Sequence, residues 1–441
     1  MLVVNLNCKI LGVVLVAALL AGGSLHAATL TVLNLNDTGA DSLRQSCADA
    51  SSGDTIVFEA ALAGTITFAG HIGIGSKNLT ITGNVNASGR PAITLSGNDA
   101  SRLFQGTAGL TVSNLRFISG NPGGLPGGAI DGGTVSATNC VFEGNEGAGG
   151  GAIRTSTAGS MLTLMNCTFH DNLSTGVGGA VTHSGDGAIS GCTFSANTGE
   201  SGGAAHFFAG SGTRVVDLAN CTFSGNLATH ASVGGGAILV AASGDGSMQV
   251  DARSCTFSDN TATAANAGQC IRLQADTVTV PQGATARFRT TNSILADTVS
   301  EPMFITGSSG PGAPLTQETS LGHNLCSDAQ GWLNQTGDQP STNPMLFALA
   351  ENGGLTRTHA LQSGSPALNT GTATGVPTTD QRGLPRDATP DIGAFEAQPG
   401  GGGGGNGDDD GDDGGCVAGV AAAIAPAWIA VLALWRRRKR Q

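Results

Sequence analysis

Two histidines and the carboxylates next to them are the best candidates for chemistry in this 441-residue chain. His170 and Asp171 are adjacent, and His183 and Asp186 follow in the same stretch of sequence. A histidine beside a carboxylate can accept and return a proton, as general acid–base catalysis requires. The simpler interpretation, which we favour, is that these are solvated surface residues. His170, Asp171 and His183 are therefore candidate catalytic residues of a protein whose enzymatic nature is uncertain.

The remaining acidic residues do not supply an obvious partner for such a base. Polysaccharide lyases use calcium-binding carboxylates with a basic residue, and glycosidases use two carboxylates on opposite sides of the scissile bond. The acidic residues of the central region are sparse, and we expect them to form no common row. They are Asp131, Glu143, Glu146, Asp171, Asp186, Glu200, Asp217, Asp245, Asp251 and Asp259.

Two further groups of polar residues could form sites. Arg357, His359, Asp380 and Arg382 lie close together in the sequence, and we interpret them as internal salt bridges of a folded C-terminal cap. The aspartate run Asp408–Asp413 could hold Ca²⁺ loosely, but it lacks the spaced ligands of a defined calcium loop. The sequence predicts no cofactor and no resident metal, with Ca²⁺ as the one weak alternative.

A repeated sequence phrase indicates the fold that places these candidate residues. The phrase NCTFHDN at 166–172 returns as NCTFSGN at 220–226, and a second phrase, GGAI or a close variant, alternates with it. The spacing between successive copies is 25, 27, 25, 29 and 34 residues, which is typical of a solenoid. The phenylalanines that mark the copies are Phe117, Phe142, Phe169, Phe194, Phe223 and Phe257.

The local pattern indicates β-strands. Within Cys-Thr-Phe, the cysteine and phenylalanine lie two residues apart, so both point to one face of a strand. We therefore predict an all-β, right-handed, single-stranded parallel β-helix with interior phenylalanine and cysteine ladders. The asparagine that closes each phrase is expected at a left-handed corner. Disulfides and metal sites are disfavoured for the cysteines, which we interpret as small buried hydrophobic residues: Cys140, Cys167, Cys192, Cys221 and Cys255.

The N-terminal segment carries a recognisable motif. Asp41-Ser42-Leu43-Arg44, Gly53-Asp54-Thr55-Ile56 and Phe58 resemble the N-terminal motif of secreted bacterial β-helix proteins of the CSLREA type. Residues 42–50 are expected to form a short helix, with Asp41 as its N-cap, that covers the first coil. Arg44 is expected to make an ion pair or carbonyl contacts in this cap.

The C-terminal part of the chain carries a second resemblance. Phrases such as Asp380-Gln381-Arg382-Gly383 and Asp391-Ile392-Gly393-Ala394-Phe395-Glu396 resemble the choice-of-anchor Q region of the same kind of protein. The end of the chain is similar to GlyGly-CTERM and JDVT-CTERM sorting tails, with Gly414-Gly415-Cys416, an apolar stretch and a basic end. This resemblance implies recognition by a rhomboid-type sorting protease.

Charge and targeting segments favour an exported protein. Apart from Lys9 and the five basic residues of the tail, 14 basic residues stand against 32 acidic ones, which argues against nucleic-acid binding. We expect a signal peptide at 1–27, read by the export machinery, and a transmembrane helix at 417–435 with its basic end inside. The mature protein is then anchored at the cell surface or membrane, or released after tail processing.

The sequence thus predicts six segments. They are a signal peptide (1–27), an N-terminal cap (28–60), β-helix coils (61–335), a choice-of-anchor Q-like region (336–396), a Gly/Asp linker (397–415) and a sorting tail (416–441). The predicted function is a structural, adhesive or carbohydrate-binding role towards a polysaccharide or cell-surface ligand. The alternative is a polysaccharide lyase or glycoside hydrolase that acts on the β-helix surface.

Overall fold

The computed structural model describes residues 27–263, 268–276, 283–296, 304–309 and 315–398. Most of the predicted signal peptide, the linker and the predicted span at 417–435 lie outside the described residues. In the part of the chain that is described, no helix is long and apolar enough to cross a membrane.

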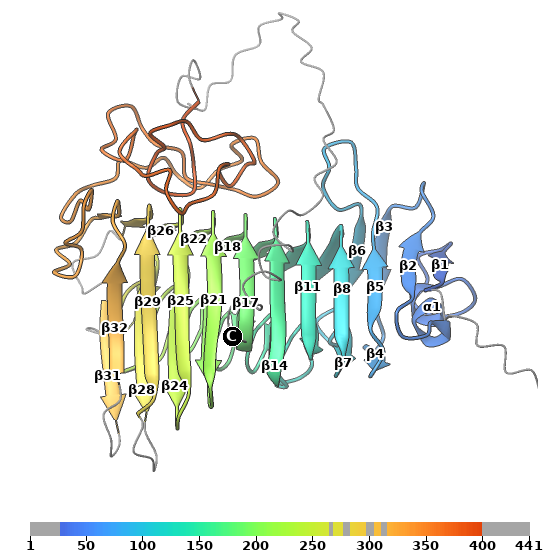
Figure 1. The fold of residues 1–441 in the computed structure, drawn as a ribbon. Helices are drawn as coiled ribbons and strands as arrows, with labels where there is room; N and C mark the ends of the chain where they lie inside the picture. The colour runs from blue at the N-terminus through green and yellow to red at the C-terminus, as the bar shows by residue number, and fades with distance from the viewer. Residues whose placement is uncertain (1–26, 264–267, 277–282, 297–303, 310–314, 399–441) are drawn as a thin grey trace, which may run out of the picture. The chain divides into compact units, whose positions relative to one another are not determined.

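The described chain winds into a parallel β-helix built from three sheets (Figure 1). Every pairing between the named strands of these sheets is parallel, as stacked coils require. Sheet A has 18 strands, sheet B has ten and sheet C has five short ones. Most coils supply two consecutive strands to sheet A, one to sheet B and, in the middle of the stack, one to sheet C.

The strand boundaries follow the repeat. Sheet A contains β1 (Thr29–Val32), β2 (Thr55–Phe58), β4 (Ile72–Gly75), β5 (Leu79–Thr82), β7 (Phe104–Gly106), β8 (Gly109–Ser113), β10 (Ile130–Gly132), β11 (Thr134–Thr138), β14 (Ile153–Met165), β17 (Val181–Ser190), β20 (Ala205–Ala209), β21 (Thr213–Ala219), β24 (Ile238–Ser243), β25 (Ser247–Arg253), β28 (Ile271–Asp276), β29 (Thr285–Thr291), β31 (Phe304–Ser309) and β32 (Leu315–Ser320). Sheet B contains β3 (Gly64–Thr67), β6 (Ile93–Ser96), β9 (Leu115–Ile118), β12 (Val141–Glu143), β15 (Thr168–His170), β18 (Thr193–Ser195), β22 (Thr222–Ser224), β26 (Thr256–Ser258), β30 (Ile294–Ala296) and β33 (Leu325–Cys326). Sheet C contains β13 (Glu146–Gly147), β16 (Leu173–Ser174), β19 (Thr198–Gly199), β23 (Leu227–Ala228) and β27 (Thr261–Ala262).

The repeated phenylalanines fix the register of sheet B. Phe142 pairs with Phe169, and Phe169 pairs with Phe194, so the side chains lie directly above one another. From Phe117 to Phe257 the rings stack nearly parallel, with centroids 4.6–4.9 Å apart. The cysteine two residues before each of the last five rings is buried and free, in the same interior. One continuous apolar core therefore runs along the helix.

The closing asparagine of each phrase does not have the left-handed backbone that was predicted for it. The left-handed residue is the one before the closing asparagine, as at Asp171 (φ 53°), and also the first residue of the phrase, as at Asn166 (φ 53°). The closing asparagines are instead buried and bond to one another from coil to coil. A buried amide can satisfy backbone groups of two coils at once, which explains why asparagine stands there. This ladder contains Asn145, Asn172, Asn197, Asn226 and Asn260.

A short helix covers the N-terminal end of the core. The helix α1 (Leu43–Asp49) buries Leu43 and Cys47 against the first coils. Its N-cap is Ser42, whose hydroxyl accepts a hydrogen bond from the Gln45 N–H, and the prediction of Asp41 was wrong by one residue. Asp41 has a left-handed backbone (φ 59°), whereas an N-cap residue normally has extended dihedrals, as Ser42 does.

Arg44 of this helix joins the N-terminal cap to the first coils. Its guanidinium lies 2.6 Å from the Asp37 carboxylate, donates to the carbonyls of Gly70 and His71, and stands over the Phe68 ring. These are the ion pair and carbonyl contacts expected of it.

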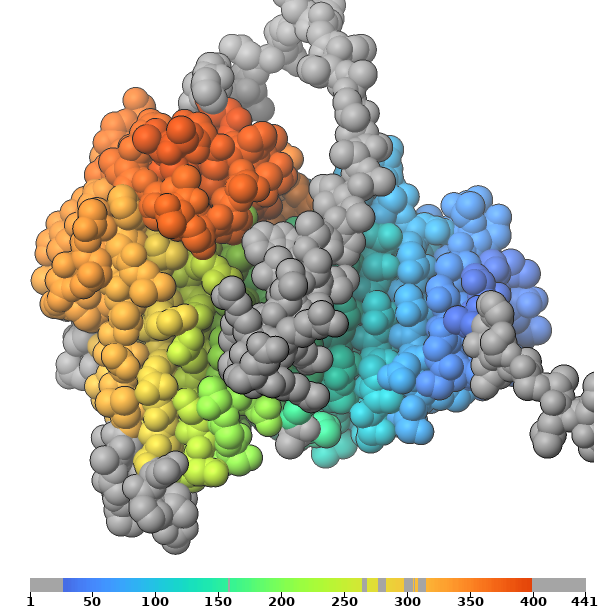
Figure 2. Space-filling view, in the orientation of Figure 1, coloured from blue at the N-terminus to red at the C-terminus, as the bar shows by residue number. Residues whose placement is uncertain are grey.

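The C-terminal region lies along sheet B and not over the open end of the helix (Figures 1 and 2). Residues 343–396 contact successive sheet B strands through Thr193, Thr222 and Thr256. The last coil is covered instead by Trp332, whose ring packs edge-on against Phe304, and by buried Leu333. The expectation of an end cap from residues 336–396 is therefore corrected, because polar contacts with outward threonines hold this region to the side of the solenoid.

Candidate functional site

The structure does not bring the predicted histidines together. His170 is on sheet B, where its Nδ1 lies 3.0 Å from Ser195 Oγ and 3.3 Å from Arg357 Nη2. His183 is on sheet A and points into the core, fully buried. Asp171 is exposed at a corner. The three residues therefore do not form one acid–base centre.

His183 is a core residue with both ring nitrogens occupied. Its Nε2 donates to the Asp186 carbonyl oxygen at 2.9 Å, and its Nδ1 accepts from the Thr155 hydroxyl at 2.6 Å. Burial lowers the pKa of His183 to about 4, although the nearby Asp186 opposes this shift. A neutral, enclosed imidazole of this kind has a packing role.

The four polar residues of the C-terminal region that lie close in sequence also do not form one site. Asp380 and Arg382 pair with each other at 2.7 Å, as internal salt bridges were expected to do. His359 bonds to the Phe347 carbonyl and to Ser224 Oγ, and burial lowers its pKa. Arg357 turns towards His170. His359 and Arg357 thus bond to sheet B, whereas Asp380 and Arg382 pair within the C-terminal region.

A different polar column stands out on the outward face of sheet A. Asp217 on β21 is directly opposite Asp251 on β25, and Asp251 is directly opposite Arg289 on β29. The prediction that the carboxylates share no row was therefore incomplete. Asp217 and Asp251 each lie four residues before a ladder cysteine, Cys221 or Cys255. Alignment on the cysteines, with loop lengths ignored, would have revealed the pair.

Asp251 is tightly held in this column. The Arg289 guanidinium meets its two carboxylate oxygens with a fork of two bonds, at 2.7 and 2.6 Å. The Gln249 amide also donates to both oxygens, at 3.1 Å. A bidentate pair of this kind is stronger than a single ionic contact and fixes both planes.

Asp217 has a different environment. Its half-buried position raises its pKa, and the negative charge of Asp251 raises it further, whereas Arg253 at 3.1 Å opposes the shift. The two carboxylates therefore differ, with Asp251 locked to a guanidinium and Asp217 easier to protonate.

A second column extends the polar surface. Gln249 on β25 is opposite Arg287 on β29, and Arg287 is opposite Gln317 on β32. Arg287 donates to Gln317 Oε1 at 3.2 Å and to Ser247 Oγ at 3.4 Å. Among the described residues, no carboxylate lies within ion-pair distance of Arg287. We call the two columns, together with the Arg253 that pairs with Asp217, the sheet A polar face: Asp217, Gln249, Asp251, Arg253, Arg287, Arg289 and Gln317.

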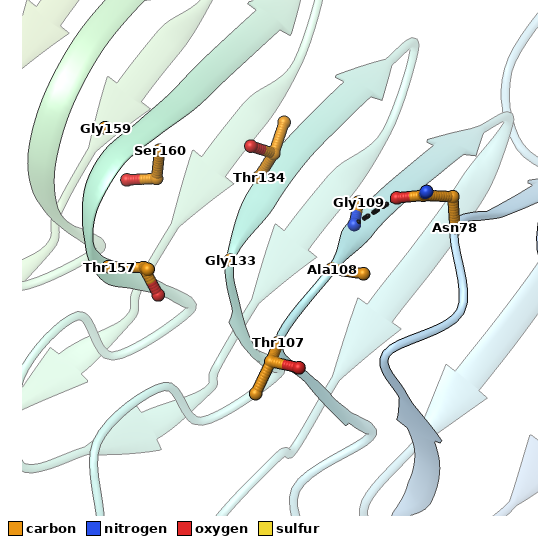
Figure 3. Close-up of a pocket in the computed structure, with 9 residues that line it drawn as sticks. All are labelled: Asn78, Thr107, Ala108, Gly109, Gly133, Thr134, Thr157, Gly159 and Ser160. Carbon is orange, nitrogen blue, oxygen red and sulfur yellow. Dashed lines mark hydrogen bonds between the residues drawn. The ribbon is translucent and has the colours of Figure 1, made fainter.

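A shallow pocket of about 370 Å³ lies on the N-terminal half of sheet A (Figure 3). Threonine, serine and glycine residues form most of its lining, and Asn78 accepts a bond from the Gly109 N–H at 2.8 Å. Its lining contains no titratable side chain, so it offers no acid–base group. Within the described parts of the chain, no three His, Cys, Asp or Glu residues are placed to hold a metal ion.

Comparison with known proteins supports the fold. The family described as "Right handed beta helix region" matches residues 75–280, just under half of the chain. Together with the parallel ladders, this match confirms the predicted right-handed parallel β-helix. The solved structure described as "Crystal structure of pectate lyase Pel9A" is 14% identical, with a TM-score of 0.44, over 84% of this chain and 96% of that one. No curated protein matches the chain.

Proposed function

We propose that this protein is an exported, surface-anchored β-helix that binds polysaccharide through the sheet A polar face. The observation that carries the proposal is the alignment of carboxylate, amide and guanidinium groups on consecutive strands. Strands in a sheet repeat every ~4.8 Å, which is similar to the advance per sugar ring in an extended glycan. Such a face presents one polar group per strand to successive sugar units.

The side chains of this face suit hydroxyl-rich ligands. Asp251, Gln249 and Arg289 already hold one another in fixed orientations, so little conformational entropy is lost when a ligand binds. Arg287 keeps further N–H donors that can bind a hydroxyl or a carboxylate of the glycan. Solenoids commonly bind their ligands on an extended surface of this kind.

Binding of the purified full-length protein to neutral and acidic polysaccharides tests the proposal. Arg289→Gln should weaken binding by about tenfold or more, because it breaks the fork that orients Asp251. Arg154→Gln is the matched control, since Arg154 is also on the outer face of sheet A and pairs with Asp131 at 2.8 Å. Equal binding by the wild type and Arg289→Gln would refute the proposed face.

The second candidate function is glycoside hydrolysis on the same face. Asp217, with its raised pKa, could donate a proton, while Asp251 stays paired with Arg289. Retaining glycosidases place their two carboxyl groups about 5 Å apart, which is close to the spacing of adjacent strands. New reducing ends that disappear in Asp217→Asn and Asp251→Asn would establish hydrolysis. Turnover lost in His170→Ala or Asp171→Ala would point back to the histidine pair.

A further inference from the structure

The C-terminal region forms hydrogen bonds with a column of outward threonines on sheet B. Thr193 Oγ1 donates to the Arg357 carbonyl at 2.6 Å, and Thr222 Oγ1 donates to Gln381 Oε1 at 2.6 Å. Thr256 Oγ1 accepts from the Ala394 N–H at 3.0 Å. Three successive coils thus have their threonine hydroxyls satisfied by residues more than 130 positions away.

The column continues one coil further, and there the pairing stops. Thr168 is directly opposite Thr193, yet its hydroxyl bonds to no other residue that the structure describes. The Asn166 side-chain amide, at the corner just before it, likewise has no partner among the described residues. The next coil carries Gly191 at that corner, so no second amide stands above Asn166. Two polar side chains are therefore left free at one place.

These two side chains open into a pocket of about 260 Å³. Thr168 and Asn166 line it from sheet B, and Leu355 of the C-terminal region lines it from the other side. Pro91 and Val141 add apolar surface, and Arg116 adds a guanidinium. The pocket is smaller than most drug-sized ligand sites, which begin at about 300 Å³.

The charges of the pocket are balanced. Arg116 pairs with Glu143 at 2.5 Å, and Arg90, which also lines the pocket, pairs with Glu351. Each guanidinium is thus already matched by a carboxylate, so the pocket has little attraction for an anion. Arg116 still has N–H groups left to donate.

We propose that this pocket binds one neutral sugar unit, such as the end residue of a glycan. The Asn166 amide and the Thr168 hydroxyl can both donate to and accept from ring hydroxyls, and the spare Arg116 N–H groups can donate to them. Pro91, Val141 and Leu355 can pack against the C–H face of the ring. The pocket shares its ligand class with the proposed function, but it is on sheet B and does not depend on the sheet A polar face.

Saturation-transfer NMR and calorimetry on the full chain test the proposal. The probes are methyl glycosides of glucose, galactose, mannose and N-acetylglucosamine, with galacturonic acid as the anionic comparison. At least one neutral glycoside should bind, and Thr168→Val and Asn166→Ala should each weaken it by about tenfold. Thr80→Val, a half-buried threonine of β5 on sheet A, should bind like the wild type.

Three outcomes would overturn the pocket. They are no binding by any neutral glycoside, binding that both pocket variants leave unchanged, and binding by galacturonic acid alone. Unchanged melting temperatures would show that the variants fold. Arg154→Gln, outside both proposed sites, should leave the binding of small glycosides intact. Polysaccharide binding reports on the sheet A polar face and methyl glycoside binding that Thr168→Val weakens reports on the pocket, so failure of the one and failure of the other can be told apart.

Discussion

At the scale of single residues, the buried asparagines do what hydrophobic packing cannot. Asn172 accepts from the Asn145 backbone N–H and side chain, and it donates to the Phe142 carbonyl and to Asn197. Its amide therefore satisfies polar groups of neighbouring coils at a corner where the strand ladder is interrupted. One residue type at one offset thus joins the coils of the stack.

Asn172→Ala should destabilise the protein by roughly 2–5 kcal/mol, because it leaves buried groups on both neighbouring coils without partners. Chemical denaturation followed by circular dichroism measures this loss. Asn36→Ala is the control, since Asn36 is exposed. A stability equal to that of the control would contradict the role of the ladder.

His183 should make the protein sensitive to acid. Its pKa is about 4 in the folded state, below the ordinary value of about 6.5 that it regains on unfolding. The unfolded chain therefore binds the proton first as the pH falls. The contribution of His183 is present above pH 6.5 and is lost between pH 6.5 and 4, up to about 3 kcal/mol.

Denaturation midpoints measured across this pH window check the effect. His183→Gln should reduce the dependence of stability on pH, because glutamine does not titrate, whereas the buried His206 and His359 still do. His71→Gln, at an exposed position, should leave the slope unchanged. A slope that is the same in His183→Gln as in the wild type would show that other groups are responsible.

At the scale of elements, the C-terminal region is fastened to sheet B by a buried glutamine. Gln381 donates to Thr193 and Thr356 and accepts from Thr222, so it joins two coils to the region outside them. Sheet B would otherwise expose these threonines. The region therefore acts as a side cover that leaves the outer face of sheet A free of its contacts.

Gln381→Ala should loosen this cover before it unfolds the helix. Hydrogen exchange should become faster in residues 343–396, while the amides of β18 and β22 in sheet B stay protected by their coil neighbours. The reason is that the lost bonds lie between the two parts, whereas each coil keeps its backbone ladder. Gln398→Ala should change neither, and simultaneous loss of protection in both parts would argue against a separable cover.

At the scale of the whole molecule, the acidic body and the predicted tail support our proposal that the protein is exported. We propose that the signal peptide is removed after Ala27 and that the tail is cut near Gly414, Gly415 and Cys416. Mass spectrometry of the protein from its native membrane should then find a mature N-terminus at Ala28 and a C-terminus within or before this motif. Replacing the three residues by alanine should leave the chain uncut, and an intact C-terminus in the unchanged protein would refute the sorting model.

The local sequence was sufficient to predict the coil, because each copy of the repeat carries the same pattern of inward and outward residues. Cys-Thr-Phe places two side chains inward and one outward on a strand, and glycine or asparagine marks the corners, so each copy specifies its own register. The β-helix, its interior rings and the N-terminal helix could be predicted for this reason. It could not be predicted that the first asparagine of the phrase has the left-handed backbone and the closing one is buried. A left-handed backbone and a buried amide both favour asparagine.

The surfaces were decided by tertiary structure. Asp217 and Asp251 share one offset from a ladder cysteine, but their pairing with Arg289 depends on loops of different length leaving the coils in register. The pocket beside Thr168 exists because a region nearly 190 residues later covers the neighbouring threonines and ends there. Strand periodicity acts over a few residues and so determines the stack. Contacts between distant segments depend on where the chain returns, and no local pattern encodes that path.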